Sequence, residues 1–215
     1  MKNWNKYLEL AQEHPVLFTA EELEVILDKD VIRKFEEETG REIGVVYESP
    51  WRYMLVDLVR NPAGKVFAYE RVVPVKSGAV AVLPVYQDGI VLIRSYRHPV
   101  QRWCWEIPRG FGSGTSVFQN AIKELFEETG IETPAVNLVR LGKVDPDSGL
   151  TADQVDLFLA EIQEFSISLA GKEETESISH VRLFSKEEVI QMIASGEITD
   201  GFTLSALAIW QLCKN

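Results

Sequence analysis

Three glutamates near the middle of the chain have the type and the spacing to hold a metal ion. Glu124 and Glu128 are four residues apart, with Glu127 beside them, in the stretch KELFEETGI. In a helix, residues four apart share one face, and like charges at that spacing destabilise the helix. A hard divalent cation such as Mg²⁺ prefers carboxylate oxygens and would turn this repulsion into coordination. A solvated acidic face is the alternative interpretation.

The surrounding residues predict a helix that begins after Ser116 and ends at Gly130. Ser116 is a suitable N-cap, and Gln119 three positions later completes a capping box. Gly130 is a suitable left-handed C-cap. Apolar residues at helical spacing predict the buried stripe, which is Phe118, Ala121, Ile122 and Leu125. The preceding loop contains glycines that allow backbone to approach a phosphate or a metal closely, namely Gly110, Gly112 and Gly114.

The chain contains the same acidic ending a second time, in RKFEEETGR between Arg33 and Arg41. Both copies end in Glu-Glu-Thr-Gly, but Lys34 stands where the other copy has Glu124, so a cation replaces one candidate ligand. No glycine-rich loop precedes this copy. We therefore predict an ordinary helix end that is capped by Gly40.

The copy from Lys123 to Ile131 resembles the box of the Nudix hydrolase family. That box reads Gly, five residues, Glu, seven residues, then Arg-Glu-aliphatic-x-Glu-Glu-x-Gly-aliphatic. The resemblance implies that Glu124 and Glu128 are metal ligands and that Glu127 is a supporting catalytic residue. It also implies that the carbonyl of Arg109 is a backbone ligand, and that the cofactor is Mg²⁺ or Mn²⁺.

The box departs from the family pattern at three points. Lys123 replaces the arginine, which keeps the charge but loses the fork that orients a carboxylate. Thr115 stands where the upstream glutamate is expected. The loop has 12 residues between Gly110 and Lys123, where the family has 13. These departures favour one alternative function, a catalytically weak or inactive nucleotide-binding module.

The resemblance extends over about residues 45–212, to members of the ADP-ribose pyrophosphatase type. Arg97 in SYRHP matches an arginine that contacts substrate phosphate, and Glu106 in WEIPRG is a further candidate for substrate binding or structural support. Glu174 and Glu176 match acidic residues that supply a catalytic base or another ligand. A surface charge is the alternative for Arg97, and a flexible acidic loop is the alternative for the two glutamates.

Aromatic residues are candidates for stacking a substrate base. Trp51 is the one that we assign to substrate binding, because the resemblance brings its region to a subunit junction near the base. Packing in a core is the alternative for any aromatic residue in a strand-like run. The other aromatic candidates are Tyr53, Trp103 and Trp105.

The resemblance implies a Mg²⁺-dependent pyrophosphohydrolase that acts on a nucleoside diphosphate joined to another group, with ADP-ribose as the first choice. A hydrolase of nucleotide sugars or dinucleotides is a further alternative. The sequence does not separate these substrates, nor does it decide which acidic loop residue is the base.

Composition limits the classes of function. The chain has 215 residues and a net charge of −11, which argues against non-specific binding to nucleic acid. No apolar run approaches the roughly 20 residues that cross a bilayer, so we expect no membrane association. The first residues lack the apolar run of a signal peptide, and Cys104 and Cys213 lack metal-type spacing. We therefore expect a cytoplasmic protein with reduced thiols.

The pattern of elements predicts two regions. Residues 1–75 read as a helical extension followed by a β-rich region, and residues 76–215 as the Nudix domain. Strands mixed with helices indicate an α/β or α+β fold. The resemblance implies an α/β/α sandwich with a mixed sheet, and a homodimer formed largely through residues 1–75. The specific elements that we expect are strands flanking a turn at 61–64, a hairpin at 88–89, strands at 155–162 and 178–184, and helices at 186–195 and 203–213.

Overall fold

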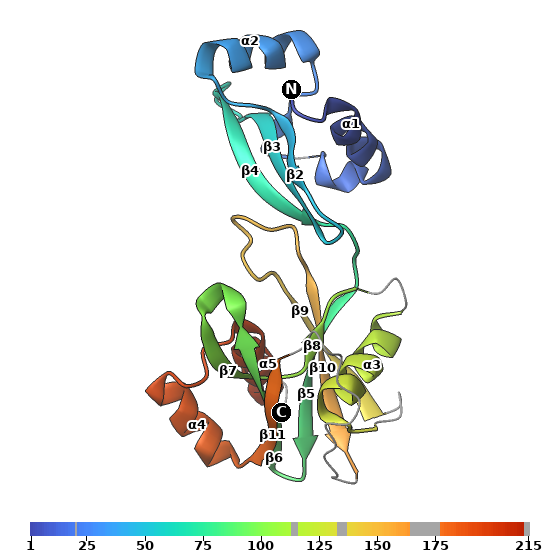
Figure 1. The fold of residues 1–215 in the computed structure, drawn as a ribbon, viewed down its shortest axis with the longest axis vertical. Helices are drawn as coiled ribbons and strands as arrows, with labels where there is room; N and C mark the ends of the chain where they lie inside the picture. The colour runs from blue at the N-terminus through green and yellow to red at the C-terminus, as the bar shows by residue number, and fades with distance from the viewer. Residues whose placement is uncertain (20, 113–115, 133–136, 164–176, 213–215) are drawn as a thin grey trace. The chain divides into compact units, whose positions relative to one another are not determined.

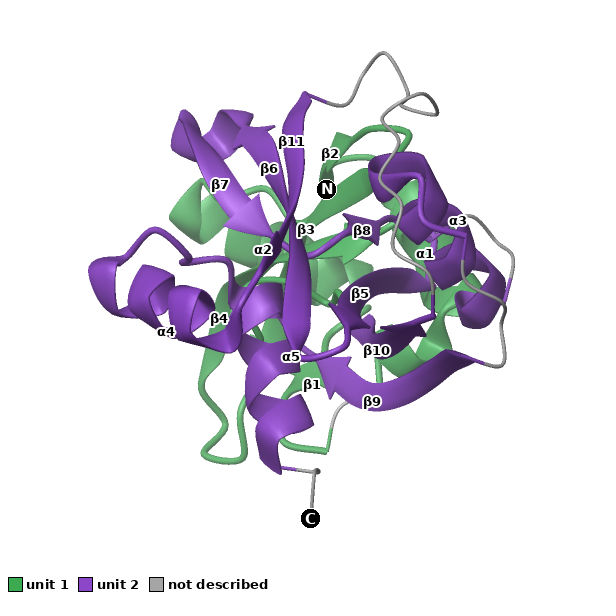
Figure 2. Ribbon diagram, turned by 90° about the horizontal axis from the view of Figure 1, so that it is seen from below, with its two compact units in different colours: residues 1–75, 147–153 green, residues 76–146, 154–215 purple. Residues whose placement is uncertain are grey.

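The computed structural model describes residues 1–19, 21–112, 116–132, 137–163 and 177–212. They form two compact units, which Figure 2 colours separately. Unit 1 contains Met1–Val75 together with Asp147–Asp153, and unit 2 contains the rest. The short segment Asp147–Asp153 therefore belongs to unit 1, although the sequence did not separate it from the second region.

Unit 1 is a four-stranded antiparallel sheet with two helices (Figure 1). Its elements are α1 (Trp4–Glu13), η1 (Pro15–Leu17), β1 (Glu24–Val25), α2 (Lys29–Thr39), β2 (Gly44–Glu48), β3 (Arg52–Arg60) and β4 (Val66–Pro74). The strands run in the order β1-β3-β2, with β4 paired to β3. The predicted strand, turn and strand are confirmed: Gly64 N donates to Asn61 O at 2.9 Å in the turn between β3 and β4.

Unit 1 has a hydrophobic core of its own. Its centre includes Tyr7 of α1, Ile32 of α2 and Leu55 of β3, all fully buried. Within this core, the Tyr7 hydroxyl donates to the Asp57 carboxylate, which also pairs with Arg71 at 2.5 Å. Burial and the charge of Asp57 raise the pKa of Tyr7. The two helices therefore cover the sheet within the unit.

Unit 2 contains the larger, seven-stranded sheet. Its elements are β5 (Ala79–Tyr86), β6 (Gly89–Arg97), η2 (His98–Val100), β7 (Arg102–Glu106), β8 (Arg109–Gly110), α3 (Val117–Thr129), β9 (Leu138–Val144), β10 (Val155–Ile162), β11 (Ile178–Phe184), α4 (Lys186–Ser195) and α5 (Gly201–Leu212). The order is β11-β6-β5-β10-β9, with β7 paired to β6 and β8 to β5. Strands β5 and β10 are parallel and the other pairs are antiparallel, so the sheet is mixed.

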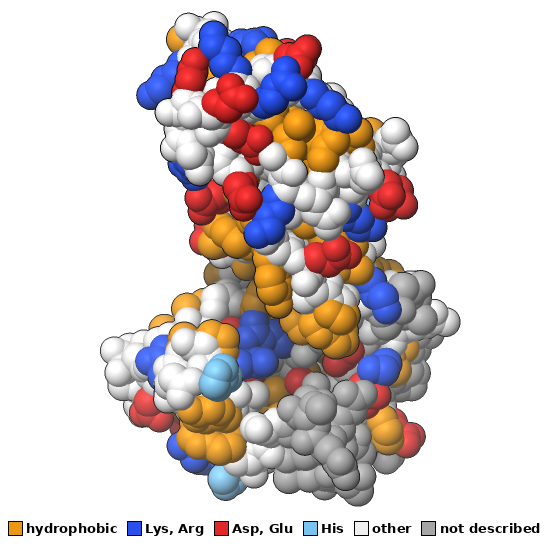
Figure 3. Space-filling model, turned by 45° about the horizontal axis from the view of Figure 1, so that its top comes forward, with side chains coloured by type: hydrophobic (Ala, Val, Ile, Leu, Met, Phe, Trp, Pro, Cys, Tyr) orange, Lys and Arg blue, Asp and Glu red, His pale blue; other side chains and the backbone are white. Residues whose placement is uncertain are grey.

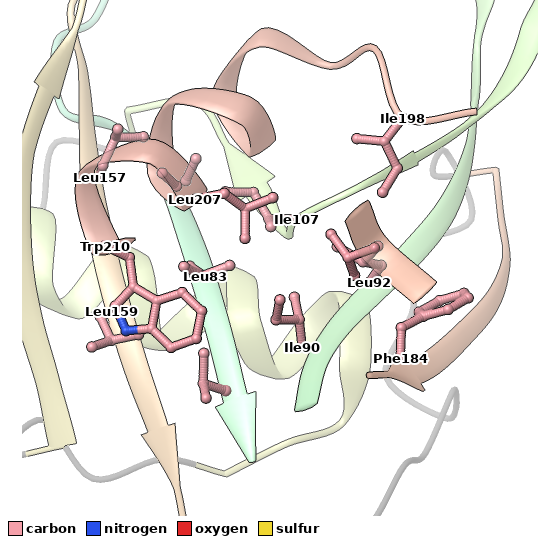
Figure 4. Packing of buried hydrophobic residues seen from close by; sticks show 14 of the residues in the cluster. Leu83, Ile90, Leu92, Ile107, Leu157, Leu159, Phe184, Ile198, Leu207 and Trp210 are labelled. Atoms are coloured by element: carbon pink, nitrogen blue, oxygen red, sulfur yellow. The ribbon is translucent and has the colours of Figure 1, made fainter. Parts of the chain in front are cut away.

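Helices cover both faces of this sheet. Successive side chains of a strand point to opposite faces, and in β5 Val80 and Val82 pack with α3 while Ala81 and Leu83 belong to the cluster with α4 and α5. Figure 4 shows part of the second cluster, with Trp210 of α5 beside Leu83 and Leu159. The predicted α/β/α sandwich with a mixed sheet is thus confirmed.

The predicted hairpin and the elements of the C-terminal part are also confirmed, within a few residues. Helix α4 begins with a complete capping box between Ser185 and Glu188, and the hydrogen bond from the Ser185 backbone lowers the pKa of Glu188. No described helix is both long and apolar enough to span a membrane. On the face shown in Figure 3, acidic and basic side chains are interspersed over unit 1.

Candidate functional site

The inward side of α3 carries polar residues at intervals of four. Asn120, Glu124 and Glu128 are only 1%, 6% and 3% exposed. The predicted apolar stripe is correct for Ala121 and Leu125 but wrong for Phe118, which is 41% exposed. Helix α3 buries a polar stripe as well as an apolar stripe, and Phe118 lies at the edge of the buried face. Its ring packs edge-on against Phe158.

Each of the three buried polar residues meets the backbone of a preceding segment. Asn120 Nδ2 donates to the carbonyls of Gly78 at 3.0 Å and Phe111 at 2.9 Å. Glu128 Oε2 accepts from the backbone N–H of Arg109 at 2.9 Å. The Glu124 carboxylate lies so close to Gly110 that a Cβ built there would overlap it. A side chain at this position would therefore displace the Glu124 carboxylate.

The local helix signals explain why α3 presents these side chains. Ser116 Oγ accepts from Gln119 N at 3.2 Å, which is one half of the predicted capping box. The helix ends at Gly130, whose φ of 73° is the predicted left-handed cap. These caps fix the register in which Glu124 and Glu128 face the loop.

The oxygen donors that meet here suit a hard divalent cation. Mg²⁺ is commonly held by one or two carboxylates and keeps several waters, and Glu124 and Glu128 are two buried carboxylates beside the Arg109 peptide. Within the described ranges, which omit 113–115 and 164–176, there is no group of three or more acidic, histidine or cysteine side chains that could hold a metal. The two buried carboxylates fit a hard divalent cation, with a backbone oxygen as the further ligand that the family pattern predicts.

Glu127 occupies a different position from the other two glutamates. Its carboxylate pairs with Lys123 Nζ at 2.6 Å, and the same ammonium lies 3.6 Å from Glu124 Oε1. Lys123 therefore links Glu127 to Glu124 as a point charge, in the place where the family pattern has an arginine. Glu127 therefore lies outside the buried stripe and is paired with Lys123.

Arg97 and Glu106 are brought together on the neighbouring strands β6 and β7. Arg97 Nε donates to Glu106 Oε2 at 3.0 Å, and Arg97 Nη2 contacts Oε1. Glu106 is completely buried. Burial disfavours the charged guanidinium, but the hydrogen bond and charge of Glu106 outweigh it and raise the pKa of Arg97. Burial also raises the pKa of Glu106, with Arg97 and Arg109 opposing it.

Sequence reasoning missed Asp200 and the side-chain role of Arg109, which together extend this ion pair. The Arg109 side chain lies with its Nη2 3.4 Å from Glu106 Oε2 and its Nη1 3.5 Å from Asp200 Oδ1. Arg97, Glu106, Arg109 and Asp200 thus form one network of alternating charge. Asp200 precedes a predicted helix, so the sequence could have identified it as an N-cap but not as a partner of Arg109. Asn120 gave no signal, because an asparagine on a helix is ordinarily exposed.

The remaining predicted residues are Trp51, the two loop glutamates, Thr115 and the other aromatic candidates. Trp51 is exposed and belongs to unit 1, next to the start of β3. Glu174 and Glu176 lie outside the described residues, as does Thr115. Among the other aromatic candidates, Trp105 packs edge-on against Phe184 in the core, which favours a structural role for that residue.

Most of the chain is similar to known proteins. Residues 75–201 match the NUDIX domain. The chain is 32% identical over 163 residues to an ADP-ribose pyrophosphatase of Bacillus subtilis (strain 168), covering 74% of this chain and 84% of that protein. It is 30% identical over 159 residues to a methanol dehydrogenase activator of Bacillus methanolicus, covering 73% and 83%.

The fold is also similar to a solved structure. A crystal structure of an ADP compounds hydrolase aligns with a TM-score of 0.66 at 19% identity, covering 80% of this chain and 90% of that chain. At this identity, the similarity supports the fold.

Proposed function

From the premise that this chain belongs to the NUDIX family, we propose that it cleaves a nucleoside diphosphate joined to a second group, with ADP-ribose as the first candidate. The chain is a hydrolase of diphosphate bonds, related to ADP-ribose pyrophosphatases. The substrate and the dependence on Mg²⁺ or Mn²⁺ are the proposal. A nucleotide-sugar substrate is the alternative within the same chemistry.

The observation that carries this proposal is the buried polar stripe of α3 against the loop. Mg²⁺ is commonly held by one or two carboxylates and keeps several waters. Glu124 and Glu128 are both buried and lie against the Arg109–Gly110 backbone, which is where the family pattern predicts the metal. These two carboxylates therefore support a cation site at this point of the helix.

Glu124, Glu128 and the carbonyl of Arg109 would hold the cation in this proposal. A bound Mg²⁺ or Mn²⁺ would neutralise charge on the diphosphate and lower the pKa of a water molecule. Glu127 and Lys123 steady this set through their ion pair at 2.6 Å.

Arg97 is the proposed contact for the substrate diphosphate. Glu106 engages its Nε and Nη2, and a guanidinium has five N–H donors. The Nη1 side is therefore the proposed contact for a phosphate oxygen, with the plane of the guanidinium fixed by Glu106. Glu174 or Glu176, outside the described residues, is the proposed acceptor of the proton from water.

A product assay tests the proposal directly. The purified chain is incubated with ADP-ribose, ADP-sugars and dinucleotides, each with Mg²⁺, with Mn²⁺ or with EDTA, and the products are separated by chromatography. We expect AMP and ribose 5-phosphate from ADP-ribose, and no turnover in EDTA. Binding of ADP-ribose without any product would favour the non-catalytic module instead, and full turnover in EDTA would contradict the metal site.

We also propose a homodimer in which unit 1 contributes to the interface, and in which the exposed Trp51 stacks a base in the partner's site. Only the family resemblance supports the dimer. The packing of unit 1 does not call for a partner, because its helices already cover its sheet. Light scattering at micromolar concentration is expected to give twice the chain mass, and a monomer would contradict it. Trp51→Ala is expected to raise KM while leaving kcat nearly unchanged.

A further inference from the structure

The start of α5 is tied to the segment that carries Arg109. Asp200 Oδ2 caps the helix by accepting from Thr203 N at 2.9 Å and from Thr203 Oγ1 at 2.8 Å. The same Thr203 hydroxyl oxygen accepts from the backbone N–H of Ile107 at 3.0 Å. Thr203 is fully buried, so these bonds are shielded from water and strengthened by their surroundings.

Two further contacts reach the side chain of Arg109 itself. Asp200 Oδ1 lies 3.5 Å from Arg109 Nη1, and the guanidinium carbon lies 4.7 Å from the centre of the Phe202 ring. The helix start therefore holds the guanidinium by charge on one side and by an aromatic face on the other. Asp200 serves two partners at once, its own helix and Arg109.

Arg109 is held at both ends. Its side chain is fixed by Asp200 and Glu106, while its backbone N–H donates to Glu128 Oε2 at 2.9 Å. One residue thus contacts the start of α5 and Glu106 through its side chain, and α3 through its peptide. Gly110, the next residue, lies against Glu124.

The charges in this network are balanced. Arg97 and Arg109 carry two positive charges, and Glu106 and Asp200 carry two negative charges. Within the described residues, the acidic ion-pair partners of Arg109 are Asp200 and Glu106, so without the charge of Asp200 only Glu106 remains. Arg109 then competes with Arg97 for that one carboxylate.

We propose that Asp200 is a positioning residue for the reaction, holding Arg109 so that the Arg109–Gly110 backbone meets Glu128 and Glu124 and so that Glu106 is kept for Arg97. This inference rests on the proposed function. It adds a residue from the far end of the chain that contacts neither the cation nor the substrate and acts through Arg109.

The variant Asp200→Asn separates the two roles of this side chain. Asparagine keeps an oxygen that can cap Thr203 and removes the charge that faces Arg109. The matched control is Asp28→Asn in unit 1, where Asp28 Oδ1 caps α2 by accepting from Asp30 N at 2.9 Å and from Val31 N at 3.1 Å. Both variants make the same change at a helix N-cap.

The experiment measures Mn²⁺ binding by electron paramagnetic resonance without substrate, and kcat and KM with ADP-ribose. We expect Asp200→Asn to weaken Mn²⁺ binding and to lower kcat/KM by about 10- to 100-fold each, the usual range for residues that orient metal ligands. The thermal midpoint should match that of Asp28→Asn, which should leave binding and turnover unchanged. Unchanged Mn²⁺ affinity, or a loss explained by a lower thermal midpoint, would overturn the proposal.

A double-mutant cycle tests the route through Arg109. If Asp200 acts only through that side chain, Asp200→Asn should add no further loss of Mn²⁺ affinity to Arg109→Met. Additive losses would overturn the proposed route. If the wild-type chain binds Mn²⁺ but cleaves none of the substrates, the proposed function fails. The measurement of Mn²⁺ binding still tests the role of Asp200 in that case. Absence of Mn²⁺ binding would overturn both the proposed function and the role of Asp200.

Discussion

The two copies of Glu-Glu-Thr-Gly close their helices in the same way. Gly40 after α2 and Gly130 after α3 have φ of 72° and 73°. In both, the threonine hydroxyl donates to the carbonyl four residues earlier and accepts from the backbone N–H two residues later. The shared letters therefore encode a helix terminus, and that terminus forms in both units.

The copies differ in what covers them. Lys34 and Glu38 pair across 3.8 Å with side chains that are 77% and 63% exposed, whereas Glu124 and Glu128 are buried against a backbone segment. Exposed i,i+4 pairs contribute about 0.3–0.5 kcal/mol. The comparison teaches that the same helix ending can occur without burial of its acidic side chains. In α3 a second backbone segment covers the carboxylates, and this cover is what makes them candidates for binding a cation.

The largest expected difference comes from neutralising the matching glutamates. Glu128→Gln should lower kcat by about 10²–10³-fold or more, as removal of one electrostatic contributor to a transition state does, because Glu128 loses its charge at the proposed cation. Glu38→Gln and Glu37→Gln should leave turnover unchanged. Steady-state kinetics compares the three variants, and circular dichroism checks that each is folded. Near-normal activity of Glu128→Gln would contradict the assignment of the metal site to α3.

Adding one methyl group at the covering loop should have the next largest effect. Gly110→Ala places a Cβ where the Glu124 carboxylate lies, so we expect about a 10- to 100-fold loss of activity as the ligand is displaced. Gly201→Ala is the matched control, since a Cβ there meets nothing within 4 Å. Equal activities of the two variants would show that the close approach is not required.

The shared caps predict equal losses of stability. Gly40→Ala and Gly130→Ala each place alanine in a left-handed conformation, at a cost of about 1–2 kcal/mol in the free energy of unfolding. Denaturant unfolding should show similar losses for both. Activity at low temperature should fall only for Gly130→Ala, because Glu128 is two residues from that cap. A loss of activity in Gly40→Ala would show that the first copy takes part in turnover.

The smallest expected effect comes from restoring the missing acid in the first copy. Lys34→Glu places glutamate four residues before Glu38, as in α3, and replaces an attractive exposed pair by a repulsive one. We expect destabilisation of about 0.5 kcal/mol and no gain in Mn²⁺ binding over wild type, measured by titration. A new Mn²⁺ site would show that the helix ending alone is sufficient.

Local signals explain what could be predicted from the sequence. Helix α3 was predictable because Ser116 and Gly130 act on their own turns. The element order indicated only an α/β or α+β fold, and the sandwich was implied by the family resemblance. Asn120 and Asp200 were not predictable as site residues, since their roles depend on a loop and an arginine that only tertiary packing brings near. Phe118 was placed wrongly because helical spacing alone does not say how wide the buried face is.

The segment Asp147–Asp153 has a consequence for how the chain is made. Val72 of β4 bonds to it through Leu150 O at 2.8 Å and Ala152 N at 2.9 Å, and Arg52 pairs with Asp153 at 2.7 Å. A ribosome adds roughly 5–20 residues per second, so residues 1–75 emerge seconds before this segment exists. During that interval the edge of β4 at Val72 lacks its partner from this segment, and an unpaired edge can pair with other chains. Translation speed between the two segments therefore sets how long this position of the edge stays open.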